Sequence, residues 1–210
     1  MCGRYVIYHK ITEKLTTLLG KTFDANFNAS PTQSLPIIRQ INGDMELSFA
    51  RWGLLPRWAK DTKIKPFFNA RADNLQGNKV FWSSRDRHCL VPMNGFYEWS
   101  QLDKQPYYIY SPEKPLLSVA GLWRSWSNGI DEFDTFSVIT TTPHPILRDI
   151  HHRSPVIIDN QDAEKWLTSD FDESSSLLEK YQGKLIKHEV SKTVNSSRNQ
   201  GASLIQRLTI

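Results

Sequence analysis

Residues 35–53 read LPIIRQINGDMELSFARWG and contain the clearest fold signal in the chain. Two runs of mostly apolar, β-prone residues flank Asn42 and Gly43. An Asn-Gly pair favours the tight two-residue turn of a β-hairpin, because both residues tolerate the positive φ that this turn requires. The segment therefore predicts two antiparallel strands joined at residues 42 and 43.

Further strands are expected downstream, where apolar runs are rich in β-branched and aromatic residues. They are PYYIYS (106–111), LLSVAGLWRSW (116–126), FDTFSVITTT (133–142), SPVIID (154–159) and LIKHEVS (185–191). Helices are expected at ITEKLTTLLG (11–20), DAEKWLTS (162–169) and SSSLLEKYQG (174–183). Because strands outnumber helices and short turns join them, we expect an α+β fold. It is predicted to be one domain over residues 1–210, with a largely antiparallel, barrel-like β-sheet core and flanking helices.

The composition is that of a globular protein, with 39% hydrophobic and 23% charged residues among 210. No apolar run approaches the ~18 residues needed to cross a bilayer, so no membrane association is expected. No apolar segment follows the first basic residues, as a secretory signal requires. Since the chain also has only two cysteines, we expect a cytoplasmic protein, and we expect it to be a monomer.

Positive charge is concentrated in the first half of the chain, although the net charge is only +4. Residues 1–105 contain 15 Lys and Arg against nine Asp and Glu, whereas residues 106–210 contain 11 against 13. Residues 51–71 combine six cationic side chains with four large aromatic ones and a single acid. This mixture is typical of single-stranded nucleic acid binding, where cations hold phosphates and rings stack on bases. It also fits buried tryptophans beside a solvated lysine loop, and Trp52, within a strand, is expected in the core.

The first five residues, MCGRY, place a cysteine directly after the initiator methionine. Removal of Met1 gives Cys2 a free α-amine with a reference pKa of about 7.7–8.0, beside a thiol of about 8.5. An aldehyde condenses with such an amine to an imine, and the thiol then adds to the same carbon and closes a thiazolidine ring. The same pair suits acyl transfer, as in N-terminal-nucleophile hydrolases. Cys2 is otherwise an incidental residue of a frayed terminus, and its chemistry requires an accessible thiol.

Two further motifs contain residue types suited to proton transfer and phosphate binding. Glu98 lies between large aromatic residues in GFYEWS (95–100), where partial desolvation raises the pKa of a carboxyl group. An edge-strand glutamate that faces water is the alternative. FFNARAD (67–73) places Asn69 and Arg71 on one side of an extended segment, as an orienting amide beside a phosphate-binding guanidinium.

RDIHHRSP (148–155) supplies two adjacent histidines, although a histidine is more often structural than catalytic. His144, His151 and His152 do not have the spacing of zinc ligands, and Cys89 is expected to be a buried strand thiol. The sequence therefore predicts neither a metal site nor a cofactor.

Taken together, these residues resemble the SRAP (SOS response-associated peptidase) family, whose members are also described as abasic-site processing proteins. The matching motifs are MCGR (1–4), NASP (28–31), WGLLPRW (52–58), NAR (69–71), GFYEW (95–99), IHHRSP (150–155) and VSKTVNSSRNQGASLIQ (190–206). Each motif is weak alone. Seven in order over nearly the whole chain, with a cysteine after Met1, make the resemblance specific.

The resemblance implies that Cys2, exposed by removal of Met1, captures the ring-opened aldehyde of an abasic site in single-stranded DNA as a thiazolidine. The adduct shields the lesion, and the same imine chemistry can lead to β-elimination, hence lyase activity. The family name records a proposed autoproteolytic activity. By position, Asn69 holds the Cys2 amine, Glu98 relays protons and His151 helps to open the deoxyribose ring. The matched DNA contacts are Arg4, Pro31, Trp58, Arg71 and Trp99.

Two positions depart from the family pattern. Ser154 replaces the methionine that usually precedes the proline, and the adjacent His152 is a second candidate for the role of His151. Asp73 stands where a glutamate is commoner. Two other functions remain open: a cysteine hydrolase with Cys2 as acyl nucleophile, and a non-catalytic single-strand DNA-binding module.

Overall fold

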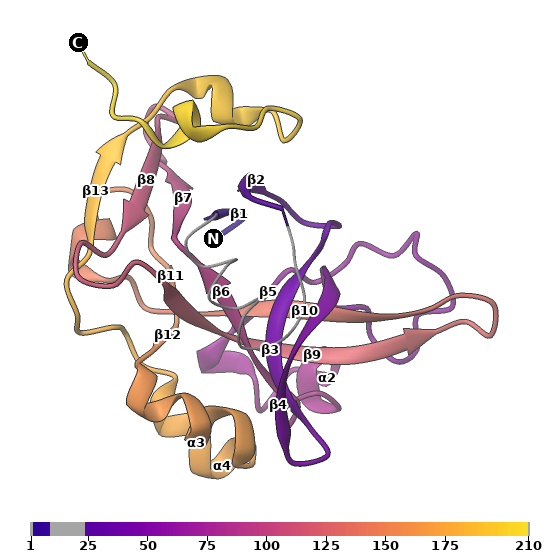
Figure 1. Ribbon diagram of the computed structural model, residues 1–210. Coiled ribbons are helices and arrows are strands. Elements are labelled where there is room, and N and C mark those ends of the chain that lie inside the picture. The colour runs from indigo at the N-terminus through magenta and orange to yellow at the C-terminus, as the bar shows by residue number, and fades with distance from the viewer. Residues whose placement is uncertain (1, 9–23, 210) are drawn as a thin grey trace.

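The computed structural model describes residues 2–8 and 24–209, and Figure 1 shows how their strands are arranged. The expected hairpin is confirmed as β3 (Ser34–Ile41) and β4 (Asp44–Trp52), which pair antiparallel over their full length. Asn42 and Gly43 form the turn with φ angles of 53° and 92°. Both values are positive, as the Asn-Gly signal predicts.

The hairpin belongs to a closed ring of five strands, which is the expected barrel-like core. β3 pairs with β6 (His88–Met93), β6 pairs with β9 (Leu117–Ser127), and β9 pairs with β10 (Glu132–Thr141). β10 closes the ring by a short parallel pairing with β4. The remaining pairs of the ring are antiparallel, so the expected α+β fold with a largely antiparallel sheet is confirmed.

A second sheet, of five antiparallel strands, lies beside the barrel. Its order is β13 (Ile186–Glu189), β8 (Pro106–Tyr110), β7 (Gly95–Trp99), β1 (Arg4–Ile7) and β2 (Asn26–Ala29). Only Asn94 separates β6 of the barrel from β7 of this sheet. The start of the chain therefore lies against the strand that leaves the barrel.

Three short strands pair with β10 or β9. β5 (Asn69–Arg71) pairs parallel with the last part of β10, and β11 (Ser154–Pro155) pairs antiparallel with its end. β12 (Ile157–Ile158) pairs with β9. The strand expected at 154–159 is thus divided at Val156, where the chain passes from β10 to β9.

Helices are short. They are α2 (Lys79–Trp82), α3 (Ala163–Thr168) and α4 (Phe171–Ser174), with 3₁₀ turns η1 (Ala72–Asn74), η2 (Pro145–Leu147), η3 (Asn160–Asp162), η4 (Ser175–Leu177), η5 (Lys192–Asn195) and η6 (Ala202–Ile205). The helix expected at 162–169 is confirmed as α3, and the one expected at 11–20 lies outside the described residues. Among the described helices, none is long and apolar enough to cross a membrane.

The helix expected at 174–183 is wrong, because helical structure ends at Leu177. The hydroxyls of Ser174 and Ser175 donate hydrogen bonds to backbone carbonyls four and three residues earlier, a local alternative that weakens helices. Leu178 and Tyr181 then pack into two different core clusters, which one helical face cannot reach together.

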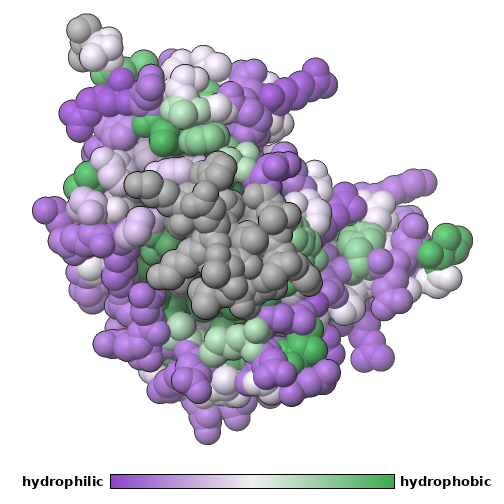
Figure 2. All heavy atoms as spheres, in the orientation of Figure 1, coloured by the Kyte–Doolittle hydropathy of each residue, from purple (hydrophilic) through white to green (hydrophobic). Residues whose placement is uncertain are grey.

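The main core cluster fills the space between the barrel and the second sheet. Trp52 is fully buried there, as expected, with its ring centroid 5.2 Å from Tyr5 and 6.1 Å from Phe136. Cys2 and Cys89 belong to the same cluster, and Cys89 is the buried strand thiol that the sequence predicts. Outside the core, hydrophilic side chains cover most of the periphery of the face in Figure 2.

A buried asparagine fixes the C-terminal segment to the second sheet. Asn28 of β2 donates from its side-chain nitrogen to the carbonyls of Val194, Ser196 and Asn199, at 2.9–3.2 Å. Its Oδ1 accepts a 2.6 Å hydrogen bond from Arg4. The motifs NASP and VSKTVNSSRNQGAS therefore support each other structurally, because the first satisfies carbonyls of the second.

Replacement of Asn28 by alanine tests this contact. Asn28→Ala leaves buried carbonyls and the Arg4 guanidinium without their partner, so we expect a loss of about 2–3 kcal/mol in the free energy of unfolding. Urea denaturation followed by fluorescence measures this loss. The exposed Asn160→Ala serves as control, with an expected change within about 0.5 kcal/mol. Equal stability of the two variants would contradict the assignment.

Candidate functional site

The candidate site residues lie where β1, β5 and β7 meet the loop before β11. β1 pairs antiparallel with β7 in the register Arg4 to Tyr97, so residues 2 and 3 run toward Glu98 at the end of β7. Asn69 in β5 hydrogen-bonds Cys2 directly. His151 follows η2, in the segment that leads into β11. The fold thus brings the four expected catalytic positions into one region.

Cys2 is fully buried in the chain that carries Met1. Burial, and secondly the nearby Glu98 carboxylate, raise the pKa of the Cys2 thiol to about 12. At neutral pH the sulfur is therefore a neutral thiol packed in the core. The expectation of an accessible thiol is wrong for this form of the chain, because the residue lies inside the cluster between the two sheets.

Asn69 holds the backbone of Cys2. Its Nδ2 donates a 2.9 Å hydrogen bond to the Cys2 carbonyl oxygen. Its Oδ1 is buried and has no hydrogen-bond partner among the residues that the structure describes. Because a buried acceptor without a partner is costly, this oxygen is suited to accept an N–H group placed beside it.

Glu98 lies on β7 and is only 4% exposed. Burial raises the pKa of its carboxyl above the ordinary value, because the charged form loses solvation. A carboxyl in this environment retains its proton to higher pH than a solvated one. Such a group is suited to donate a proton and to take one back.

His151 is half-buried, and burial is the main cause that lowers its pKa to about 4. The imidazole is therefore neutral at physiological pH. Its Nδ1 lies 3.0 Å from the backbone nitrogen of Arg153 and 3.3 Å from the Arg153 carbonyl oxygen. The shorter contact, in which the Arg153 N–H donates, makes Nδ1 the acceptor and places the proton of the neutral ring on Nε2. His152 stacks on it with ring centroids 4.3 Å apart and contacts Gln101, just beyond β7. The histidine pair thus adjoins the end of β7.

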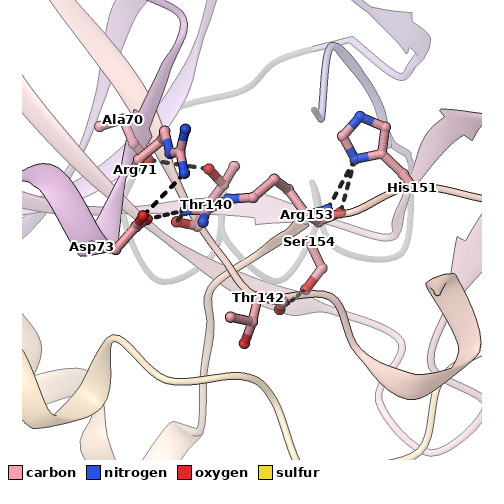
Figure 3. A network of polar contacts seen from close by, with 8 residues as sticks. All are labelled: Ala70, Arg71, Asp73, Thr140, Thr142, His151, Arg153 and Ser154. Carbon is pink, nitrogen blue, oxygen red and sulfur yellow. Dashed lines mark hydrogen bonds and ion pairs between the residues drawn. The ribbon is translucent and has the colours of Figure 1, made fainter.

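Figure 3 shows a network that connects β5 with this histidine segment. Asp73 accepts from Arg71 at 3.1 Å through Oδ2 and from Arg153 at 2.7 Å through Oδ1. Burial acts to raise the pKa of Asp73, but the hydrogen bonds from Arg153 and Arg71 outweigh it and lower the pKa. Arg153 also donates to the Thr140 carbonyl at 2.6 Å. Asp73 therefore remains charged and joins two guanidinium groups.

The expected DNA-contact residues differ in their exposure. The side chain of Arg71 is 57% exposed and Trp58 is 61% exposed, so both are open to a ligand. Pro31 is half-buried in the turn before β3. Trp99 is half-buried and donates from its indole nitrogen to Asn195 at 2.8 Å.

Arg4 has a structural environment. Besides its bond to Asn28, its guanidinium donates to the carbonyls of Val194 and Asn195 at 3.0 and 3.1 Å. Burial lowers its pKa, although it still carries its charge near neutral pH. These contacts attach the C-terminal segment to β1, so in this form of the chain the side chain serves the fold.

The basic segment 51–71 divides as its sequence suggests. Trp52 is core, whereas Arg57, Lys60, Lys63 and Lys65 lie exposed on the loop between β4 and β5. This loop begins after Trp52 and ends at Asn69. Its cations and Trp58 therefore lie on the loop that leads into β5 and Arg71. Among the described residues, no group of three or more His, Cys, Asp or Glu side chains could hold a metal ion.

Sequence reasoning missed two residues that organise this region. Asn28 and Arg153 were quoted within motifs without a role, yet Asn28 supports the C-terminal segment and Arg153 connects His151 with Asp73. Opposite charges two residues apart, at Arg71 and Asp73, gave a local signal for one ion pair. The second pair joins positions 80 residues apart and had no such signal.

The fold and site define a barrel protein whose second residue, a cysteine, accepts a hydrogen bond from the side chain of Asn69 and lies near the buried carboxyl of Glu98. Comparison with known proteins gives the family. The sequence profile described as SOS response associated peptidase (SRAP) matches residues 1–197. The chain therefore belongs to the SRAP family, and the resemblance seen in the sequence is confirmed.

Similar proteins support this assignment over most of the chain. Abasic site processing protein YoqW of Bacillus subtilis (strain 168) is 32% identical, over 98% of this chain and 99% of its own. Abasic site processing protein HMCES of Xenopus tropicalis is 29% identical, over 84% of this chain and 64% of its own. A crystal structure of a protein from Bacteroides thetaiotaomicron superposes with a TM-score of 0.82 at 26% identity, covering 99% of this chain and 100% of that one.

The burial of both cysteines predicts their behaviour toward thiol reagents. In folded protein verified by mass to retain Met1, we expect negligible alkylation of Cys2 and Cys89 near neutral pH, because both thiols are buried and un-ionised. Unfolding in denaturant should expose both to full modification. Peptide mass spectrometry reports each site, and rapid labelling of Cys2 in the folded protein would show that its burial is misassigned.

Proposed function

We propose that this protein processes abasic sites in single-stranded DNA by forming a covalent bond through Cys2 once Met1 is removed. The observation that carries the proposal is the placement of residue 2. The Cys2 carbonyl accepts a hydrogen bond from Asn69, whose Oδ1 has no hydrogen-bond partner among the described residues. The carboxyl of Glu98 is near enough to raise the pKa of the Cys2 thiol. The family, and the names of relatives that are abasic site processing proteins, support abasic DNA as the substrate.

The reaction balances without a cofactor. The α-amine of Cys2 attacks the C1′ aldehyde of the ring-opened abasic site and forms a carbinolamine. The carbinolamine loses its hydroxyl as water to give an iminium ion, and the Cys2 sulfur adds to the same carbon. The product is a thiazolidine in which nitrogen and sulfur are both bonded to C1′, and one water is released. The second step is intramolecular, which favours ring closure.

Asn69 and Glu98 have distinct tasks in this scheme. Asn69 Oδ1 accepts an N–H of the new amine and directs its lone pair toward the aldehyde. Protonated Glu98 donates its proton to the departing hydroxyl, and the resulting carboxylate then takes the proton of the thiol as sulfur attacks. Glu98 is thereby regenerated. The raised pKa of Glu98 supports the first task, because burial keeps its acid form to a higher pH than that of a solvated glutamate.

His151 assists the opening of the deoxyribose ring. Its Nε2–H hydrogen-bonds to the ring oxygen O4′ as the C1′–O4′ bond breaks, and the proton of the C1′ hydroxyl passes to O4′ through solvent water. The sugar is then an aldehyde with a free 4′-hydroxyl, and His151 keeps its own proton. A neutral imidazole can act as such a hydrogen-bond donor, and a lowered pKa keeps it neutral. The contact of Nδ1 with Arg153 favours His151 over the exposed His152 for this task.

DNA is proposed to follow the exposed cations of the β4–β5 loop toward Cys2. Arg71 binds a phosphate and Trp58 stacks on a base, which their exposure permits. Pro31 and Trp99 line the path closer to the lesion. Arg4 reaches a phosphate only if it gives up contacts with the C-terminal segment, so we assign it the weakest role of the five.

Burial of the Cys2 thiol bears on the choice between crosslinking and hydrolysis. An acyl nucleophile needs a thiolate at the start of the reaction, and burial, which raises the pKa of the Cys2 thiol in the chain that carries Met1, disfavours a thiolate. Imine formation begins at nitrogen and needs no thiolate. Because Cys2 is fully buried in the chain that carries Met1, the proposal also requires that removal of Met1 opens residue 2 to the aldehyde. Crosslinking is therefore the proposed main activity, with strand cleavage by β-elimination from the imine as a side reaction and peptidase activity at the N-terminus as the alternative.

A denaturing gel tests the proposal with three protein forms. Protein that lacks Met1 should give a band of protein plus oligonucleotide only when the strand contains an abasic site. Protein that retains Met1 should give none, because the amine is in an amide bond. Cys2→Ala without Met1 keeps the amine, so it should lose the stable adduct yet retain some strand cleavage.

The other functions predict different gels. A cysteine hydrolase turns over an amide substrate without this band, and a simple binding module shifts the oligonucleotide on native gels only. Normal crosslinking by protein that retains Met1, or an unchanged adduct yield with Cys2→Ala, would rule out the thiazolidine.

Glu98 predicts the pH dependence of the crosslinking rate. The rate should fall as pH rises through the raised pKa of Glu98, because its acid form is then lost. Glu98→Gln should slow crosslinking by roughly 10²–10⁴-fold and abolish this decline. Single-turnover rates across pH measure both effects. The same declining limb in Glu98→Gln would assign it to another group.

A further inference from the structure

Asp73 connects an exposed arginine with a buried one. Its Oδ2 contacts Arg71, whose side chain is 57% exposed, and its Oδ1 contacts Arg153, whose side chain is 7% exposed. Both ion pairs share one carboxylate in the 3₁₀ turn η1, directly after β5 (Figure 3). The carboxylate thus lies between the proposed phosphate contact and the segment that contains His151.

The pair with Arg153 has the greater structural weight. A guanidinium that is nearly excluded from water needs a compensating charge, and among the described carboxylates only Asp73 lies within ion-pair distance of it. The same nitrogen, Nη2, also donates to the Thr140 carbonyl at 2.6 Å. Thr140 lies opposite both Arg71 of β5 and Pro155 of β11, so the Arg153 side chain is anchored where the two strands flank β10.

The backbone of Arg153 in turn fixes His151. Its N–H donates to His151 Nδ1 at 3.0 Å, and this contact decides which ring nitrogen carries the proton. Movement of Arg153 therefore changes the orientation and the tautomer of His151. The pair between Arg71 and Asp73 is different, because both partners are more than half exposed and such a pair is weak. A DNA phosphate can replace it at little cost.

We propose that Asp73 is a positioning residue that holds Arg153, and through it His151, in the orientation needed for ring opening, while restraining Arg71 until DNA binds. The inference rests on the proposed function. It separates two effects of the Asp73 side chain. The ion pair with Arg153 affects the chemical step, and the ion pair with Arg71 affects DNA affinity.

The test compares Asp73→Asn and Asp73→Glu with the wild type in two measurements. With protein that lacks Met1, the single-turnover crosslinking rate of Asp73→Asn should fall by about tenfold to a hundredfold, as misplaced catalytic groups produce. Its dissociation constant for a single strand without an abasic site should stay the same or decrease, since the substitution removes a negative charge next to the proposed phosphate contact. Asp73→Glu keeps the charge and should recover most of the rate.

The second measurement reads the tautomer of His151 in the free protein from a long-range proton–nitrogen correlation spectrum. The wild type and Asp73→Glu should show one tautomer with the proton on Nε2, whereas Asp73→Asn should show a mixture. The exposed Asp44→Asn makes the same charge change in the β3–β4 hairpin and should leave both rate and tautomer unchanged. It also measures how far net charge alone alters affinity.

Arg71→Gln removes only the ion pair between Arg71 and Asp73, and it can still be used if Asp73→Asn does not fold. It should weaken DNA binding and flatten the dependence of that binding on salt, with the His151 tautomer unchanged. The proposal is overturned if Asp73→Asn keeps the wild-type crosslinking rate and a single His151 tautomer. It is also overturned if the crosslinking rate and the DNA affinity of Asp73→Asn fall by the same factor while the His151 tautomer is unchanged. A tautomer change in Arg71→Gln also overturns it. Failure of the wild type to crosslink would reject the proposed function, while the tautomer comparison still decides the role of Asp73.

Discussion

The register of β10 is the constraint on which the site depends. Its first half pairs parallel with β4 and closes the barrel, and its second half pairs parallel with β5 and antiparallel with β11. One strand therefore places Asn69 and Arg71 on one side and the segment after His151 on the other. A shift of one residue would turn every side chain of these short strands to the opposite face, and would separate Asn69 from Cys2.

Desolvation gives the proposed chemical groups a common property. It raises the pKa of the Cys2 thiol and of the Glu98 carboxyl and lowers that of His151, so each group favours its neutral form. A condensation that begins with a neutral amine and releases water suits such a site. Charge is retained instead at Asp73, where two guanidinium groups stabilise the carboxylate.

The sequence predicted features that depend on neighbouring residues, such as turns. It did not predict features that depend on contacts between distant segments. Asn42 and Gly43 predict the hairpin correctly because its turn requires residues that tolerate a positive φ. Closure of the barrel by β10, the burial of Cys2 and the ion pair between Asp73 and Arg153 depend on segments far apart in sequence. The helix expected at 174–183 failed because periodicity alone does not register the competing serine hydroxyls. The family motifs located Asn69, Glu98 and His151 but not the contacts that orient them.

Chemical analysis of the DNA adduct shows whether the nitrogen and the sulfur of Cys2 are both bonded to C1′. Protein without Met1 is coupled to a strand with one abasic site, digested, and the N-terminal peptide is examined by mass spectrometry after borohydride reduction and after alkylation of thiols. The account predicts a peptide that carries the sugar less one water, resists reduction and has no thiol left to alkylate, because nitrogen and sulfur share C1′. A reducible adduct with a free Cys2 thiol, or a sugar attached at any other residue, would contradict it.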